Sequence, residues 1–149
     1  MNVVTCHTAK VILALCLLCS CGQRGKSNNA EATTATKVTA QNIDISFQAL
    51  SDGLTDTLRF GTMHAGEIIE KRLQLTNTDN RPMVLLRHVT SCGCTTIKYE
   101  RKPIAPNGKS ELHFEYNSRA QSGWQMKLME LYFADSDSPL KIYIEAEVE

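Results

Sequence analysis

Apolar and polar residues alternate with a period of two along most of the chain after residue 42. Where Leu112, Phe114 and Tyr116 recur, for example, glutamate and histidine occupy the positions between them. Successive side chains of a β-strand point to opposite faces, so this alternation predicts strands with one buried face and one exposed face. Strands are expected within residues 43–47, 67–76, 83–89, 111–116, 125–133 and 140–148.

Turn-forming residues separate the predicted strands. Glycine, proline, asparagine, aspartate and serine gather at residues 51–53, 79–82, 105–108 and 135–139, and these residue types favour tight turns. No helical stretch of useful length interrupts the pattern. Residues 42–149 are therefore expected to form one all-β domain, an immunoglobulin-like antiparallel β-sandwich of about seven strands. About 105 residues are enough for one modest hydrophobic core.

The first 20 residues have a different character. Lys10 is their only positive charge, and an unbroken apolar run of nine residues follows at 11–19. Nine residues span about 14 Å as a helix, too short to cross a bilayer but suited to the centre of a secretory signal. Residues 18–21 (Leu-Cys-Ser-Cys) resemble the bacterial lipobox, in which the chain is cut before an acylated cysteine.

Residues 1–20 are therefore predicted to be a lipoprotein signal peptide, and Cys21 to carry the lipid that anchors the protein. Two or more acyl chains on one cysteine anchor a protein stably, whereas one chain alone is marginal. An ordinary signal peptide and a cytosolic start are the alternatives.

A polar stretch follows Cys21. Residues 22–41 contain one large apolar residue, Val38, and no periodicity, so they cannot bury enough apolar surface to become ordered. A flexible tether is predicted over residues 21–41, with a peripheral strand at 37–40 as the alternative. Twenty such residues have a root-mean-square reach of roughly 25 Å.

Charge and the first mature residues restrict partners and location. The chain has 16 basic and 16 acidic residues, and no basic tract stands out, which argues against nucleic acid as a partner. Loss of Lys10 with the signal makes the mature form slightly acidic. Gly22 stands where aspartate retains many lipoproteins in the inner membrane, and residues 22–28 lack an acidic surface-export run. The expected location is the outer membrane, with the domain facing the periplasm.

Several short motifs occur in an order that resembles the bacterial domain of unknown function 1573 family. They are F-G-T at 60–62, N-T at 77–78, S-C-G-C-T at 91–95, P-I-A-P-N-G at 103–108 and Y-N at 116–117. The S-C-G-C-T block is the most specific of them, and the resemblance covers residues 58–148. The chain departs from the family pattern at Asp79, where N-T-G is usual, and at Asn107, where P-G is usual. Both residues lie in predicted turns that Asn and Asp also form.

This resemblance implies an immunoglobulin-like fold, similar to modules of cilia-associated and sperm proteins that bind partners and have no active site. It also implies an exported lipoprotein, as in many members from Bacteroides-like bacteria, which agrees with Cys21. The family has no assigned activity, so the resemblance implies no substrate.

Two cysteines remain as protein thiols once the signal is removed and Cys21 is acylated. Cys92 and Cys94 are two residues apart, a Cα separation of about 6.5 Å in an extended strand, whereas a disulfide requires about 5.5–6 Å. A local disulfide therefore needs a bend, which Gly93 is expected to supply through a positive φ. Four interpretations stay open: a local disulfide that shapes the turn, a soft-metal site for Cu(I), a redox-active dithiol, and either a disulfide to a partner or two free thiols.

A metal site would need further ligands besides the two cysteines. His88 and Met83 are the soft candidates near in sequence, and the distant ones are Met63, His64, His113, Met126 and Met129. Each has a structural alternative. His113 alternates with glutamates on a solvated face, and His88 ends a strand. Met126 and Met129 lie on opposite faces of one strand, so at most one of them can join a site, and both are typical core residues.

The expected function is binding rather than catalysis. No G-x-S-x-G, H-E-x-x-H or phosphate-loop motif occurs, and we predict neither enzymatic activity nor a cofactor. We expect a lipid-anchored module of the cell envelope that binds another envelope protein through edge strands or through Ser91, Gly93 and Thr95. Trp124, the only tryptophan, is expected in the core, with an interface anchor as the alternative. The second hypothesis is a thiol-redox or copper-handling protein that acts through the two cysteines.

Overall fold

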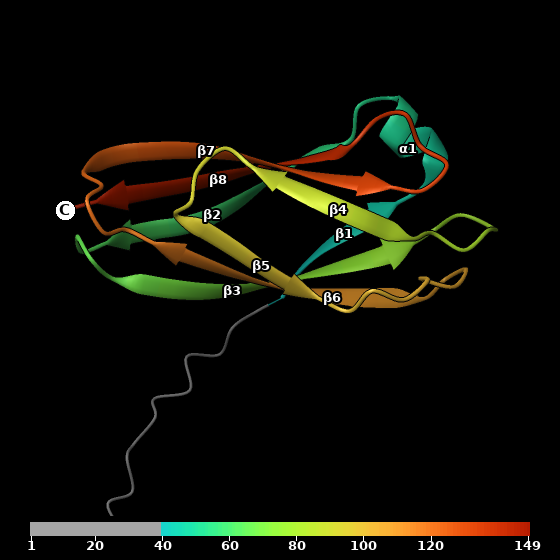
Figure 1. Ribbon diagram of the computed structural model, residues 1–149, viewed down its shortest axis with the longest axis horizontal. Helices are drawn as coiled ribbons and strands as arrows, with labels where there is room; N and C mark the ends of the chain where they lie inside the picture. Colours follow the sequence, from blue (N-terminus) through green and yellow to red (C-terminus); the bar gives the residue numbers. More distant parts are fainter. Residues whose placement is uncertain (1–39) are drawn as a thin grey trace, which may run out of the picture. The chain divides into compact units, whose positions relative to one another are not determined.

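Two four-stranded β-sheets packed face to face make up the domain (Figure 1). The computed structural model describes residues 40–149. Its elements are β1 (Gln41–Ile45), α1 (Phe47–Ser51), β2 (Thr55–Met63), β3 (Ile68–Asn77), β4 (Leu85–Thr90), β5 (Thr95–Tyr99), β6 (Lys109–Asn117), β7 (Gly123–Phe133) and β8 (Leu140–Val148). The first sheet has the strand order β1-β3-β6-β5, and the second sheet has the order β2-β8-β7-β4. The predicted all-β sandwich is confirmed.

The pairing of the strands refines the prediction in one respect. Each sheet has one parallel pair at its edge, β1 with β3 and β2 with β8, while the other four pairs of the described residues are antiparallel. The sandwich is therefore mixed and has eight strands, where a purely antiparallel one of about seven was expected. Side-chain alternation reveals which face of a strand is buried, but it carries no information about the direction of the neighbouring strand.

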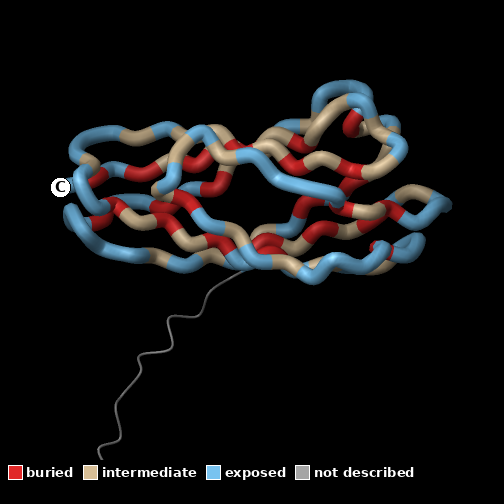
Figure 2. The backbone as a smooth tube through the Cα atoms, viewed as in Figure 1, coloured by how far each residue is buried: buried red, intermediate tan, exposed pale blue. Residues whose placement is uncertain are grey.

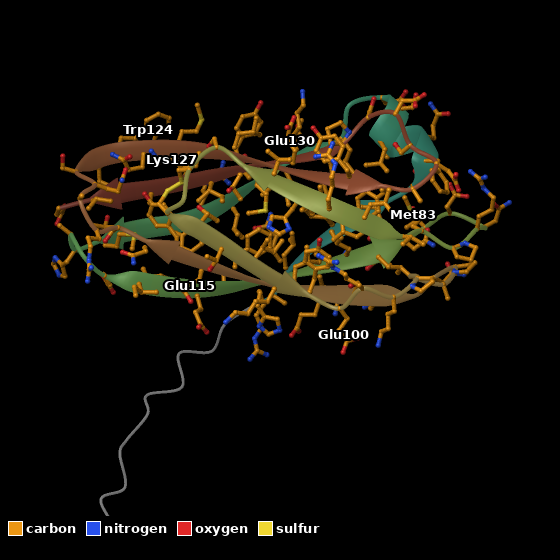
Figure 3. The ribbon with its side chains drawn as sticks, in the orientation of Figure 1. Met83, Glu100, Glu115, Trp124, Lys127 and Glu130 are labelled. Atoms are coloured by element: carbon orange, nitrogen blue, oxygen red, sulfur yellow. A yellow bond between two sulfur atoms is a disulfide. The ribbon has the colours of Figure 1, made fainter. Side chains whose placement is uncertain are left out.

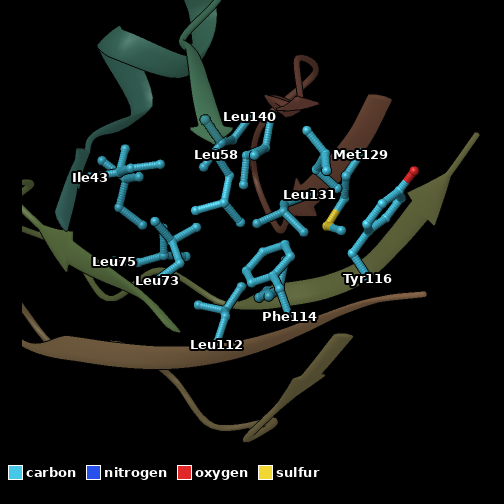
Figure 4. Packing of buried hydrophobic residues seen from close by; sticks show 14 of the residues in the cluster. Ile43, Leu58, Leu73, Leu75, Leu112, Phe114, Tyr116, Met129, Leu131 and Leu140 are labelled. Atoms are coloured by element: carbon cyan, nitrogen blue, oxygen red, sulfur yellow. The ribbon is translucent and has the colours of Figure 1, made fainter. Parts of the chain in front are cut away.

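The inward faces of both sheets share one hydrophobic core, visible as the buried positions between the two layers (Figure 2) and as the packed side chains of Figure 4. Alternate residues of the predicted strands contribute to it, over the whole length of 140–148 and over part of the length of 83–89 and 125–133. The largest fully buried side chains are Tyr116, Phe114, Ile45, Leu50, Leu58, Leu73, Leu75, Met83, Leu112, Met129, Leu131 and Leu140. Burial of each large apolar side chain contributes about 1.5–3 kcal/mol, so these positions account for most of the driving force for folding.

The beginning of the domain departs from the predicted pattern. Phe47, expected to continue the first strand, begins α1 instead. The Ser46 hydroxyl accepts a hydrogen bond from the Ala49 N–H at 3.1 Å, and this cap favours a helical turn over a longer strand. β1 begins at Gln41, the last residue of the predicted tether, and Ala40 precedes it outside the strand; residues 1–39, which include the rest of the tether, Cys21 and the predicted signal, lie outside the described residues. From residue 40 onward, no helix is long and apolar enough to span a bilayer.

A buried asparagine connects two loops at one end of the sandwich. The Asn77 amide nitrogen donates to the carbonyl oxygens of Arg81 at 2.8 Å and Ile104 at 2.9 Å, and its Oδ1 accepts from the Asp79 N–H at 2.9 Å. These bonds satisfy a polar side chain that is costly to bury alone. Asp79 in turn accepts from the Phe47 N–H at 3.1 Å, the main cause of its lowered pKa. Asp79 therefore links this turn to α1.

Candidate functional site

The cysteine pair lies where the chain crosses from one sheet to the other. β4 is an edge strand of the second sheet, β5 is an edge strand of the first, and residues 91–94 connect them (Figure 1). Cys92 and Cys94 are joined by a disulfide, with their Cα atoms 5.3 Å apart. Both cysteines are half-buried, and Gly93 between them is exposed. We call residues 91–94 the disulfide corner; it corresponds to the first of the four interpretations, a local disulfide within a turn.

The disulfide corner does not use the conformation that was expected of Gly93. The glycines with a positive φ are Gly53, Gly61, Gly66 and Gly123, and Gly93 is not among them. The prediction of a positive φ at Gly93 is therefore wrong: the turn over residues 91–94 brings the cysteines together without a left-handed residue. A Cβ built on Gly93 meets no atom within 4 Å, so the fold has room for a side chain there. Because glycine has no side chain, no side chain of residue 93 covers the surface beside the disulfide.

Hydrogen bonds hold the disulfide corner to both sheets. The Ser91 N–H donates to the Leu128 carbonyl at 2.9 Å, and the Leu128 N–H donates to the Ser91 hydroxyl at 2.9 Å. At the other end, the Asn117 N–H donates to the Cys94 carbonyl at 2.9 Å. The corner is thus attached to β7 at its beginning and to β6 at its end.

Two of the predicted binding residues belong to this framework. The Ser91 hydroxyl is engaged by β7, as described above, although the residue itself is exposed. Thr95 is 5% exposed, and its hydroxyl lies 3.8 Å from Cys92 Sγ. The structure corrects the prediction for Thr95: it occupies an inward position of β5 opposite Tyr116, so its side chain supports the corner from inside. Of the three residues, Gly93 is the one whose surface is free.

Two of the predicted histidine ligands contact residues other than the cysteines. His88 packs edge-on against Tyr99, with ring centroids 5.7 Å apart, and His113 Nε2 lies 2.8 Å from a Glu111 carboxylate oxygen. Within residues 40–149, no three His, Cys, Asp or Glu side chains form a group that could hold a metal ion. His88 therefore does not join Cys92 and Cys94. A core position was the alternative interpretation for Met126 and Met129: it is confirmed for Met129, which is buried, and wrong for Met126, which is 50% exposed. Met63 and Met83 are also buried in the core, and His64 is exposed.

An apolar stripe runs along the outward face of β7. Trp124 is 60% exposed and Met126 is 50% exposed, and Leu128 follows on the same face because alternate residues of a strand share a face. Figure 3 shows Trp124 on the outer side of the second sheet. The expected core position of Trp124 is wrong, because the inward positions of β7 are those of Met129 and Leu131. We call Trp124, Met126 and Leu128 the β7 stripe.

A shallow hollow of about 220 Å³ adjoins Trp124 on the β8 side. It is lined by Arg59, Gly61, Thr62, Trp124, Glu145, Ala146 and Glu147. Gly61 and Ala146, which pair across β2 and β8, are among the residues that line it. Arg59 Nε lies 3.1 Å from Glu145 Oε2, so these two charges largely satisfy each other. The hollow extends the surface around the β7 stripe and does not reach the cysteines.

Comparison with known proteins identifies the family. The model of a family described as protein of unknown function (DUF1573) matches residues 53–148. The chain belongs to the DUF1573 family. The expected family membership is confirmed, and the match begins slightly before the expected residue 58.

Solved structures show the same fold in other proteins. The DUF1573 chain is similar to a protein of unknown function from Porphyromonas gingivalis W83, with a TM-score of 0.56 and 18% identity over 78% of this chain and 51% of that one. It is also similar to the VesB protease of Vibrio cholerae, with a TM-score of 0.55 and 11% identity over 68% of this chain and 34% of that one. The chain thus spans about half or less of these proteins, and identities this low show a shared fold alone. Curated proteins give no match.

The residues at 91–95 of this DUF1573 protein were predicted as candidates, whereas Met126 was considered only as a metal ligand or core residue. A signal for the stripe is present in the sequence. Trp124, Met126 and Leu128 occupy even positions, and Met129, Leu131 and Phe133 occupy odd ones. The apolar phase of β7 therefore reverses between Leu128 and Met129, and one of the two sets has to face outward.

Proposed function

We propose that this DUF1573 protein is a lipid-anchored, non-enzymatic module of the cell envelope that binds another envelope protein through the β7 stripe. The observation that carries the proposal is the exposure of Trp124 and Met126 on a regular strand. Neither side chain is needed to fill the core, whose inward positions are supplied by other residues of β7. A surface with this composition gains free energy when a partner covers it, at roughly 25 cal/mol per Å² of apolar area.

The surroundings of the stripe have the organisation of an interface. Trp124 lies opposite Glu147 and Met126 lies opposite Glu145 on β8, so a polar rim borders the apolar centre on that side. On the other side, Val89 of β4 is 41% exposed and lies opposite Glu130. Contiguous exposed apolar residues of this kind mark protein interaction sites, and tryptophan is among the residues enriched at binding hot spots.

Photo-crosslinking in the native host tests the binding role. A photoreactive phenylalanine derivative replaces Trp124 in the full chain, which retains an aromatic side chain at the most exposed position of the stripe. The expected result is one major adduct with an envelope protein. The matched control places the same residue at Arg72, on the exposed outward face of the first sheet, where no such adduct is expected. Absence of an adduct at position 124, or equal adducts at both positions, contradicts the proposed function.

The membrane anchor is the part of the proposal that rests on residues 11–21 of the sequence. Cys21→Ala should abolish metabolic labelling with palmitate and release the domain from membranes, because the lipid is the only attachment proposed. Protease added to intact cells should leave the domain uncut if it faces the periplasm. Unchanged labelling contradicts the anchor, and cleavage in intact cells contradicts the orientation.

A second candidate function, thiol redox or copper handling, is favoured by the half-buried disulfide next to an exposed Gly93. A loop this short restricts the unfolded chain little, so the disulfide is expected to add little to the free energy of unfolding, which favours a further role for the two cysteines. Reduction would produce two thiolates, the soft ligands that suit Cu(I). Equilibration of the protein with thiol buffers separates the two functions. A reduction potential well above about −300 mV supports a redox role, and resistance to reduction at that potential indicates a structural disulfide.

A further inference from the structure

We propose that the edge of β7 at residues 123–127 accepts an extended segment of the partner protein as an added β-strand, in line with β4. This inference rests on the proposed binding function and deepens it, because it specifies how the partner is held. The stripe supplies side-chain contacts, and the neighbouring strand edge supplies backbone hydrogen bonds. Strand addition to an open sheet edge is a general mode of peptide recognition.

The edge is open because β4 is shorter than β7. β4 pairs with β7 from Leu85 opposite Phe133 to Thr90 opposite Met129. Ser91 adds one more contact, to Leu128, and the chain then leaves for the first sheet through the disulfide corner. In the part of the chain that the structure describes, no strand pairs with residues 123–127 on this side, although β8 pairs with all of them on the other. We call this segment the β7 edge.

Alternate backbone groups of the β7 edge point toward the side of β7 on which β4 has ended. The N–H and C=O of Leu128 both face the β4 side, where they bond to Ser91. Since these groups alternate in direction along a strand, those of Met126 and Trp124 face the same side, and those of Lys127 and Gln125 face β8. An incoming strand therefore meets two donors and two acceptors, which belong to the two most exposed residues of the stripe.

The β7 stripe determines the chemistry of the segment that fits. A strand added beside β7 places alternate side chains on the outward face, next to Trp124 and Met126. Aromatic and thioether side chains favour apolar or aromatic cross-strand neighbours. The fitting segment is therefore extended, about five residues long, and apolar at alternate positions. Five residues correspond to roughly 17 Å of strand.

The disulfide corner limits the β7 edge at one end. Ser91 occupies the position beside Leu128, and the disulfide with its hydrogen bonds keeps the chain from continuing along β7. Gly123, with φ of 67°, begins β7 and limits the edge at the other end. The cysteines therefore do not contact the proposed strand directly. The disulfide fixes the turn that begins beside Leu128, and this turn keeps the chain after β4 from pairing with residues 123–127.

A partner segment fits this edge better than a second copy of the chain. Two copies paired through their β7 edges would overlap over five residues each, because each edge is limited by its own corner and turn. Stable interfaces between folded proteins engage about 20–30 residues a side. A flexible extended segment needs no second folded surface and can follow the edge along its whole length.

Hydrogen exchange of the unmodified, full-length mature protein tests the strand addition. The probe is a library of acetylated and amidated nine-residue peptides with apolar residues at alternate positions. Binding is detected by the emission of Trp124, the only tryptophan of the chain. With a bound peptide, the amide protons of Trp124 and Met126 should exchange at least tenfold more slowly, whereas those of Gln125 and Lys127 should change less than twofold. A library with no binder at millimolar concentration, or protection without this alternation, overturns the inference.

Crosslinking in cells separates this inference from the proposed function. Met126→Pro, combined with the photoreactive residue at position 124, removes the N–H that points toward the open edge of β7. The pairing with β8 remains, since proline is tolerated where the N–H of a strand faces away from its neighbour. Met126→Ala keeps the N–H and is the matched control. The adduct should fall at least tenfold with proline and at most threefold with alanine. If Met126→Pro fails to fold by circular dichroism, the exchange experiment on the unmodified protein decides.

Equal adducts in the two variants overturn strand addition while the binding function stands. An adduct with a second copy of the chain overturns the choice of partner. No adduct in either variant or in the unmodified background contradicts the proposed function, and this inference with it.

Discussion

The outward faces of the two sheets differ although both are built on the same two-residue period. On the first sheet, the outward positions are polar along most of β3 and β6: Glu70, Arg72, Gln74, Thr76, Lys109, Glu111, His113 and Glu115. Only Ile68, at the beginning of β3, interrupts this face as an exposed apolar residue. On the second sheet, the outward positions of β7 carry Trp124, Met126 and Leu128. The inward positions are apolar on both sheets.

This difference shows that folding requires apolar residues at the inward positions but not at the outward positions. A sandwich needs apolar inward faces, and the first sheet, where Ile68 is the exception, shows that the outward positions can be polar along most of two strands. Trp124 and Met126 of the β7 stripe therefore lie outside the core, beside a strand edge that no strand of residues 40–149 pairs with. The proposed role in binding rests on this combination. The disulfide corner lies where these two features meet, next to Leu128.

The largest expected effects come from charges at inward positions of either sheet. Leu73→Asp on the first sheet and Leu131→Asp on the second each bury an unpaired carboxylate where the side chain is 0% exposed. Each should lower the free energy of unfolding by several kcal/mol, comparable to the total stability of a small domain. Denaturant unfolding measures the loss. Gln74→Asp, outward and next to Leu73, should stay within about 0.5 kcal/mol of the unmodified protein. A large difference between the two inward variants would show that the sheets do not share one core.

A smaller but substantial loss is expected at the buried amide of the first sheet. Asn77→Ala leaves the Arg81 carbonyl and the Asp79 N–H without this partner and removes one of the two donors to the Ile104 carbonyl, which keeps its bond from the Met83 N–H. The loss should cost about 2–4 kcal/mol because unsatisfied buried polar groups keep their desolvation penalty. Asn80→Ala, in the exposed part of the same loop, is the control and should be near neutral. A neutral Asn77→Ala in denaturant unfolding would mean that water replaces the asparagine, and that this loop is not held from within.

Removal of the disulfide should have a modest effect on stability. For the Cys92→Ser and Cys94→Ser double variant, the chain entropy of a three-residue loop corresponds to about 1–2 kcal/mol. The free energy of binding should fall by more than the free energy of unfolding, because the disulfide no longer fixes the turn that keeps the β7 edge open. The two readouts are denaturant unfolding and the Trp124 emission titration. A double variant that fails to fold assigns the cysteines to structure, and one that binds unchanged removes the disulfide corner from the site.

The smallest effect is expected at Tyr116. Its hydroxyl is buried and has no hydrogen-bond partner among the described residues, and burial raises its pKa above the usual 10.0. Tyr116→Phe should therefore be neutral or slightly stabilising near pH 7, within about 1 kcal/mol. Above pH 10 the unfolded chain ionises this tyrosine first, so the unmodified protein should lose stability as pH rises toward the folded pKa, and the variant should lack this part of the loss. Equal pH dependence of both proteins would contradict the buried, unpartnered hydroxyl.

Sequence alone predicted the strands and their inward faces where the alternation is in one phase. Leu112, Phe114 and Tyr116 are buried as expected, and so are the alternating residues of β8. It did not predict the parallel edge pairs, since the two-residue alternation within a strand is the same whether the neighbouring strand is parallel or antiparallel. Phe47 was misplaced for a local reason: the Ser46 cap turns the chain into α1 before the strand can include it.

The site was predicted less completely than the fold. The S-C-G-C-T block located the cysteines, and the structure places them at a crossover between sheets, which no local pattern reveals. Trp124 was assigned to the core because large aromatic residues usually lie there. Its exposure follows from the phase reversal within β7, and the open edge follows from the early end of β4 at Thr90. An unpaired edge depends on the lengths of two strands that pair only in the folded protein.

The most direct test of the central claim compares the two outward faces position for position. The partner crosslinked at position 124 is purified, and its affinity is measured for two double variants of the full chain. Trp124→Ser with Met126→Ser should weaken binding at least a hundredfold, because hot-spot residues contribute 2 kcal/mol or more each, while the free energy of unfolding changes by less than about 0.5 kcal/mol. Arg72→Ser with Gln74→Ser should bind like the unmodified protein. Loss of affinity in the first-sheet variant, with unchanged affinity in the β7 variant, would contradict the claim that the β7 stripe is the binding surface.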